Sequence, residues 1–144
     1  MKKILSICLI LMLVNTNVMA GEVYDNIYEN AEIKHEGVRE ISYSQFLELR
    51  DSGEPYVLLD VLMLGSYSRG HIPGAENFPV PEIIVENAEK RLNKNASIVV
   101  YCGSSHCMAS VMAAKKLGEL GYKNIVDFKG GLQEWQEKGN KLVK

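Results

Sequence analysis

The fold of this 144-residue chain is decided by residues 97–120, which have the sequence SIVVYCGSSHCMASVMAAKKLGEL. Residues 97–101 are apolar apart from the leading serine, which is typical of a strand buried on both faces of a parallel sheet. Residues 109–120 have apolar side chains at helical spacing, and Gly121 follows them as a helix terminator. A loop of small and polar residues that begins with Cys102 joins the two segments. The stretch therefore predicts a strand, a loop and a helix in succession.

The same alternation continues on both sides of this unit. Strands are predicted over 56–61 and 124–128, and helices over 81–92 and 132–138, with turns at 51–55, 70–75 and 130–131. A further helix, capped by Ser42 or Ser44, is predicted to end near Arg50. Alternating strands and helices predict an α/β fold in which a parallel sheet carries helices on both faces.

Composition limits the class of protein. The chain is 47% hydrophobic and 24% charged, with a formal net charge of −2, which excludes a disordered segment and a basic nucleic-acid binder. Its three cysteines are too few for a disulfide-built scaffold. No phosphate loop, nucleotide fingerprint or serine triad is present, so we expect no cofactor.

Residues 1–20 have the pattern of a secretory signal peptide, with a cationic start, an apolar run over 4–14 and small residues before Gly21. The run is shorter than the roughly 18 apolar residues that span a bilayer. We therefore expect cleavage after Ala20, export to the periplasm, and no membrane span in the mature chain. Cys102 and Cys107 are then the cysteines that remain, in an oxidising compartment.

The rest of the chain divides into two parts. Residues 21–38 are polar and have no sustained helical or strand period, so we predict an N-terminal extension that lies against the domain. Residues 39–144 are predicted to form one domain.

Cys102 is the strongest candidate for chemistry. In an open parallel sheet, ligands bind beyond the carboxyl ends of the strands, which is where Cys102 is predicted to lie. Free backbone N–H groups between this strand and the next helix can converge on an anion and favour the thiolate at Cys102. The alternative is an inert cysteine at the end of a core strand. The glycine, serines and histidine that follow favour a nucleophile.

From Ile41 to Lys144 the chain resembles the rhodanese-like (sulfurtransferase) domain family. The resemblance rests on several motifs in the expected order: Val57-Leu58-Leu59-Asp60-Val61, Tyr67-x-x-Gly70-His71-Ile72-Pro73-Gly74-Ala75-x-Asn77, Val99-Val100-Tyr101-Cys102, Ser110-x-x-Ala113-Ala114 with Leu117 and Gly121-Tyr122, and Gly130-Gly131-x-x-x-Trp135.

This resemblance implies a fold and a reaction. The fold is a five-stranded parallel sheet flanked by helices on both faces. The reaction uses the active-site cysteine, here Cys102, to take a sulfane sulfur from a small donor such as thiosulfate. The cysteine holds this sulfur as a persulfide and passes it to an acceptor thiol, cyanide or a protein thiol.

The chain departs from the family pattern around this cysteine. The family's loop has six residues from the cysteine to an arginine, whereas here eight residues run from Cys102 to Ala109, which stands in the arginine's place. Met108 lies where related phosphatases carry their arginine, so phosphatase activity is not expected. Weak thiosulfate turnover is expected, because backbone amides and a few polar side chains replace permanent charge. The predicted substrate-binding loop consists of Gly103, Ser104, Ser105, His106, Met108 and Ala109.

The longer loop also contains Cys107. We predict that Cys107 can resolve a Cys102 persulfide by forming either a disulfide with release of sulfide or a short polysulfide bridge. The alternative is that Cys107 is a small apolar residue at the start of the helix. The Cys102-x4-Cys107 spacing is not that of a structural zinc site and a fourth ligand is missing, so no metal is expected.

Three more residues are candidate supporting groups. Asp60 is expected to accept backbone N–H groups rather than act as a base, and His71 is expected to pack within the 70–75 connector. Arg69 is the nearest basic residue that would replace the missing loop cation, although an exposed arginine is the commoner case. Whether His106 steadies a thiolate or faces solvent stays open. Two rival functions also stay open: a non-catalytic binding or redox-sensing module, and a thiol–disulfide oxidoreductase.

Overall fold

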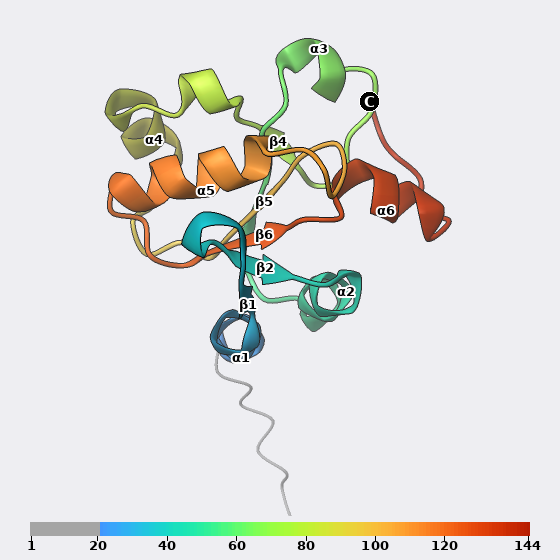
Figure 1. Ribbon diagram of the computed structural model, residues 1–144, viewed down its shortest axis with the longest axis horizontal. Coiled ribbons are helices and arrows are strands. Elements are labelled where there is room, and N and C mark those ends of the chain that lie inside the picture. The colour runs from blue at the N-terminus through green and yellow to red at the C-terminus, as the bar shows by residue number, and fades with distance from the viewer. Residues whose placement is uncertain (1–20) are drawn as a thin grey trace, which may run out of the picture.

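The computed structural model describes residues 21–144, and the predicted signal peptide over residues 1–20 lies outside them (Figure 1). Within the described part, one sheet has the strand order β1-β2-β6-β5-β3-β4. The strands are β1 (Glu32–Ile33), β2 (Arg39–Ile41), β3 (Val57–Asp60), β4 (Glu76–Asn77), β5 (Ile98–Tyr101) and β6 (Ile125–Phe128). The helices are α1 (Glu22–Asn30), α2 (Tyr43–Ser52), α3 (Leu64–Tyr67), α4 (Val85–Arg91), α5 (Ala109–Glu119) and α6 (Gly131–Glu137), with 3-10 turns η1 (His35–Gly37) and η2 (Val80–Glu82).

The sheet confirms the predicted α/β class, but not the strand count. Strands β2, β6, β5, β3 and β4 run parallel, as the resemblance implies. The count of five was wrong, because β1 adds a sixth, antiparallel strand beside β2. The chain reverses between them through Gly37, whose φ of +84° favours glycine.

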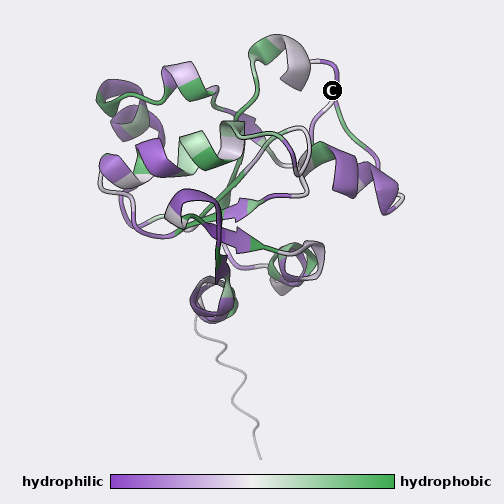
Figure 2. Cartoon of the chain, in the orientation of Figure 1, coloured by the Kyte–Doolittle hydropathy of each residue, from purple (hydrophilic) through white to green (hydrophobic). Residues whose placement is uncertain are grey.

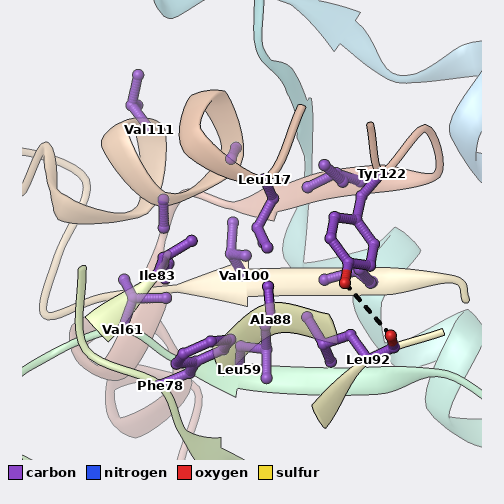
Figure 3. Packing of buried hydrophobic residues seen from close by; sticks show 14 of the residues in the cluster. Leu59, Val61, Phe78, Ile83, Ala88, Leu92, Val100, Val111, Leu117 and Tyr122 are labelled. Atoms are coloured by element: carbon purple, nitrogen blue, oxygen red, sulfur yellow. Dashed lines mark hydrogen bonds between the residues drawn. The ribbon is translucent and has the colours of Figure 1, made fainter. Parts of the chain in front are cut away.

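Helices cover both faces of the sheet (Figure 1). Helices α4 and α5 pack over the face that presents Leu59 and Val100, and Figure 3 shows Val111 and Leu117 of α5 lying over this cluster. Tyr122 closes one end of the cluster by donating a hydrogen bond to the Leu92 carbonyl at 3.3 Å (Figure 3).

Helices α1, α2 and α6 pack over the opposite face. Phe46 of α2 stacks on Phe128 of β6 with ring centroids 4.6 Å apart, and Trp135 of α6 meets Phe46 edge-on at 6.0 Å. Figure 2 shows α6 as largely hydrophilic along its length, which fits a helix that buries only a narrow face. Two buried layers therefore hold the central strands and fix the sheet edge from which Cys102 emerges.

Residues 21–38, whose sequence has no sustained helical or strand period, form α1, β1 and η1. Tyr24 of α1 is buried, and its hydroxyl donates to the carbonyls of Ile98 and Asn124 at 3.0 and 2.8 Å. The first N–H groups of α1 are capped by the Glu54 carboxylate, which accepts from Val23 and Tyr24 at 2.9 Å each. A nine-residue helix of this kind depends on distant partners, which local periodicity does not reveal.

The helix predicted over 81–92 was also wrong in part. The segment forms η2 and then α4, with extended backbone at Ile84 between them (φ −127°, ψ 161°). Ile83 is 2% exposed and enters the core, so burial of this side chain interrupts the helix. The short elements α3, β2 and β4 had no periodic signal of their own.

We predict that Tyr24→Phe lowers the free energy of unfolding by about 1 kcal/mol, because it removes the buried hydroxyl that donates toward the Ile98 and Asn124 carbonyls. Urea unfolding of the chain from residue 21 measures this change. Tyr28→Phe is the matched control on the same helix, since its hydroxyl bonds the exposed Lys123 carbonyl, and it should cost about 0.5 kcal/mol or less. Equal losses in the two variants would contradict the anchoring role of Tyr24.

Candidate active site

Cys102 follows β5 directly, between the carboxyl ends of β3 and β6. Its side chain is 1% exposed and lies under the loop that leads into α5. The sulfur lies 3.3 Å from the Cys107 carbonyl oxygen and 3.3 Å from the Ser110 hydroxyl. The loop therefore folds back over its own first residue.

The rest of the loop forms the rim around this thiol. A turn closes it where the Cys107 N–H donates to the Ser104 carbonyl at 3.0 Å. Ser105, His106 and Met108 are exposed, whereas Gly103, Ser104, Cys107 and Ala109 are partly buried. The predicted substrate-binding residues thus surround Cys102, and Cys107 is the second thiol at the site.

The base of the loop is fixed by the start of α6. The Leu132 N–H donates to the Cys102 carbonyl at 3.0 Å, and the Gln133 N–H donates to the Gly103 carbonyl at 2.9 Å. Gly131 has a φ of +57°, and a Cβ there would lie 2.1 Å from the Cys102 carbonyl oxygen. The Gly130-Gly131 turn therefore permits the close approach that sets the position of Cys102.

The pKa values of the two thiols shift in opposite directions, upward at Cys102 and downward at Cys107. Burial raises the pKa of the Cys102 thiol to about 11, and its hydrogen bond with Cys107 acts in the same direction. The hydroxyl and N–H of Ser110 lower this pKa by less. Burial therefore favours the neutral thiol form of Cys102.

Burial also raises the pKa of Cys107, but opposing contacts outweigh it and the net pKa lies below the ordinary value. These contacts are hydrogen bonds from the Cys102 side chain and from the N–H groups of Ala109 and Gly103, together with the charge of Lys129. The convergent backbone amides expected at Cys102 thus favour the thiolate of Cys107 instead.

Lys129 is the cation of the site, and sequence reasoning missed it. It follows β6, is only 7% exposed, and donates from Nζ to the Cys107 carbonyl oxygen. It supplies a positive charge to a loop whose family arginine is replaced by Ala109. Arg69 instead is exposed and donates to the Ser66 hydroxyl at 3.0 Å. The available signal was a lysine at the carboxyl end of the strand next to β5.

Asp127 of β6 was missed as well. It is fully buried, and its Oδ2 accepts a hydrogen bond from the Ser110 hydroxyl at 2.9 Å. Burial raises the pKa of this carboxyl to about 7, although Ser110 and Lys129 oppose the rise. Its Oδ1 has no hydrogen-bond partner within residues 21–144. A carboxylate thus lies in contact with a residue that touches the Cys102 thiol.

The structure places Asp60 at the end of β3 and His71 in the connector that follows α3. Asp60 accepts hydrogen bonds from the Leu62 N–H at 3.0 Å and from the Tyr101 hydroxyl at 2.9 Å. His71 stacks on Tyr67 with ring centroids 3.7 Å apart, and its Nδ1 lies 3.1 Å from the Tyr67 carbonyl oxygen. Their hydrogen bonds serve the connector rather than the Cys102 thiol.

A polar groove of about 640 Å³ lies beside the loop. It is lined by Asn30, Glu32, Lys34, Glu40, Ile41, Ser42, Gln45, Ser105, Lys129, Gly130, Gln133, Glu134 and Glu137. Within residues 21–144, no cluster of three or more His, Cys, Asp or Glu side chains is arranged to hold a metal. Across the same residues, none of the helices has the length and apolarity needed to cross a bilayer.

Comparison with known proteins gives this site a family. The model of the rhodanese-like domain matches residues 42–138, which include both cysteines, Ser110, Asp127 and Lys129. Thiosulfate sulfurtransferase GlpE of Pseudoalteromonas translucida (strain TAC 125) is 36% identical over 98 residues, covering 68% of this chain and 89% of that protein.

Two more similarities cover most of the chain. The YrkF protein of Bacillus subtilis (strain 168) is 32% identical over 110 residues, or 76% of this chain, which spans only 57% of that protein's length. Among solved structures, the rhodanese-like domain of the Alr3790 protein from Anabaena sp. matches with a TM-score of 0.64 and 28% identity, covering 72% of this chain and 77% of that one.

We predict that Lys129→Met raises the pKa of Cys107, because it removes a positive charge and leaves burial opposed by fewer groups. Alkylation of Cys107 by iodoacetamide near neutral pH should slow several-fold, as followed by peptide mass spectrometry. Lys123→Met, at the exposed opposite end of β6, should leave the rate unchanged. A Lys129→Met protein with the wild-type pH–rate profile would show that Lys129 does not tune Cys107.

Proposed function

We propose that this chain, which belongs to the rhodanese-like domain family, moves sulfane sulfur through a persulfide on Cys102. The observation that carries the proposal is the position of Cys102 at the carboxyl end of a central strand, enclosed by an eight-residue loop. The similarity to a thiosulfate sulfurtransferase supports the same reaction class.

The transfer has two steps. The Cys102 thiolate attacks the outer sulfur of a donor, so that a new S–S bond forms on Cys102 while the donor's S–S bond breaks. With thiosulfate, sulfite leaves with the bonding electron pair. An acceptor thiolate or cyanide then attacks the outer sulfur of the persulfide, and Cys102 leaves as a thiolate.

Cys107 gives the persulfide a second outcome. Its thiolate attacks the inner sulfur of the Cys102 persulfide, forms a Cys102–Cys107 disulfide and releases hydrosulfide. A dithiol reductant must then return the pair to two thiols. The lowered pKa and partial exposure of Cys107 support this role.

The charge distribution favours persulfide or polysulfide donors over thiosulfate. Thiosulfate is a dianion, and the loop has Ala109 where the family has an arginine. Lys129, the cation that is present, is engaged with the Cys107 carbonyl. Donors with less charge at the transferred sulfur depend less on a permanent cation.

Intact-mass measurement before and after treatment with a polysulfide, glutathione persulfide or thiosulfate tests the proposal. We predict a gain of one sulfur atom on Cys102 that Cys107→Ala retains until cyanide or a thiol is added, with thiosulfate the slowest donor. In the wild type the added sulfur should leave as hydrosulfide as the Cys102–Cys107 disulfide forms. Cys102→Ser should take up none. Cys107→Ala should load but release less hydrosulfide.

Three other results would contradict parts of the proposal. No sulfur on Cys102 of Cys107→Ala from any donor would overturn the proposed transfer. A reversible Cys102–Cys107 disulfide that forms in the wild type without release of hydrosulfide would indicate a thiol–disulfide oxidoreductase. If Cys107→Ala loads and discharges as the wild type does, Cys107 is a packing residue.

We also propose that residues 1–20 direct export and that the mature chain begins at Gly21 in the periplasm. Cell fractionation and N-terminal sequencing of the expressed full-length chain test this. The expected product is a periplasmic protein that starts at Gly21, and Ala20→Arg should block cleavage. A cytoplasmic protein that keeps Met1 would contradict export.

A further inference from the structure

We propose that Asp127 is a positioning residue that accepts the Cys102 proton through the Ser110 hydroxyl. This inference rests on the proposed function in one respect, namely that Cys102 is the thiol that receives sulfur. It concerns a carboxylate that the transfer steps above do not use.

The three side chains form a continuous hydrogen-bonded line. The Cys102 sulfur lies 3.3 Å from Ser110 Oγ, and Ser110 Oγ lies 2.9 Å from Asp127 Oδ2. Their residues are 1%, 0% and 0% exposed, so water does not compete along the line. The thiol has a single hydrogen, which it donates either to Ser110 Oγ or to the Cys107 carbonyl.

The fold brings the line together from separate elements. Val100, which lies two residues before Cys102 in the chain, pairs with Asp127 of β6. Helix α5 crosses above these two strands, with Ser110 in its first turn (Figure 1). Asp127 therefore lies on the face of the sheet that α5 covers.

Burying this carboxyl is costly for the fold. It sits among apolar residues of the sheet, and its Oδ1 is unpartnered within residues 21–144. A buried polar atom without a hydrogen bond costs about 1–3 kcal/mol, which an apolar residue at this position would avoid. An apolar side chain would fill this position without that loss of stability, whereas only a carboxylate can accept a proton here.

The surrounding charges leave Asp127 able to hold a proton near neutral pH. Burial is the largest influence and raises its pKa to about 7. Lys129 and His35 lower the pKa of Asp127, whereas Glu40, which pairs with it from β2, raises it. The Cys102 thiol, with its pKa near 11, would form little thiolate unaided.

The proton step conserves charge and atoms. The Ser110 hydroxyl proton passes to Asp127 Oδ2 while the Cys102 S–H proton passes to Ser110 Oγ. The products are a Cys102 thiolate and a neutral Asp127, and the S–H bond breaks as the sulfur attacks the donor. When an acceptor removes the sulfane sulfur, the reverse transfer restores the Cys102 thiol.

The test is the pH dependence of Cys102 alkylation and of its sulfur loading, resolved by peptide mass spectrometry. The wild-type rate should fall as the pH falls through about 7, because Asp127 becomes protonated and no longer accepts a proton. Asp127→Asn should slow the reaction at neutral pH by about 10- to 100-fold. It should also remove the part of the pH–rate profile that changes near pH 7, called the pH 7 limb below. The rate of the variant should rise only at the higher pH at which the Cys102 thiol itself loses its proton.

Matched variants separate a proton path from a structural effect. Ser110→Ala should behave as Asp127→Asn does, and Ser110→Thr should restore the pH 7 limb. Glu40→Gln should keep the pH 7 limb and move it to lower pH, because the carboxylate that raises the pKa of Asp127 is gone.

An unchanged profile in folded Asp127→Asn overturns the inference, and if that variant does not fold, an unchanged profile in Ser110→Ala does so. Failure of Cys102 in Cys107→Ala to take up sulfur overturns the proposed function instead. The alkylation profile still decides the role of Asp127 in that case.

Discussion

The site depends on the hydrogen bond between the Leu132 N–H and the Cys102 carbonyl, across a contact that only glycine at position 131 permits. This bond ties the end of β5 to the start of α6, and the bond from Gln133 to Gly103 adds a second tie. From these two fixed residues the rest of the loop runs to Ser110 in the first turn of α5. The result is a loop that closes over the thiol.

The closed loop sets the chemistry of its two thiols. Enclosure of Cys102 disfavours its charge, whereas the amides of Gly103 and Ala109 and the charge of Lys129 favour the thiolate of Cys107. The cation reaches the loop from the neighbouring strand rather than from within the loop. An arginine in the loop would point at a bound anion, but Lys129 contacts the backbone carbonyl of Cys107. Lys129 therefore acts on the loop more than on a donor.

The sequence predicted the elements whose burial follows a simple period. Strand β5 and helix α5 lie within a residue of their expected bounds, because their apolar residues face the core at regular intervals. Helix α1 was missed because its cap, Glu54, lies 30 residues away. Cys102 and its loop were predicted from local chemistry alone. Lys129 and Asp127 were not, because their contacts depend on the register of β5 against β6, which no local pattern encodes.

The two additional residues of the loop explain why an enclosed Cys102 and a second thiol, Cys107, occur together at this site. A six-residue loop that runs from its cysteine to an arginine places one cation and one thiol at the site. The longer loop instead places the Cys107 carbonyl against the Cys102 sulfur and places the Cys107 thiol among the loop amides. A nucleophile whose neutral thiol form is favoured then needs a proton acceptor that solvent does not supply, since Cys102 is 1% exposed. The buried carboxyl of Asp127, reached through Ser110, is the group within the described chain that meets this need by geometry. The burial that would keep water from the proposed Cys102 persulfide is thus what makes an internal base necessary.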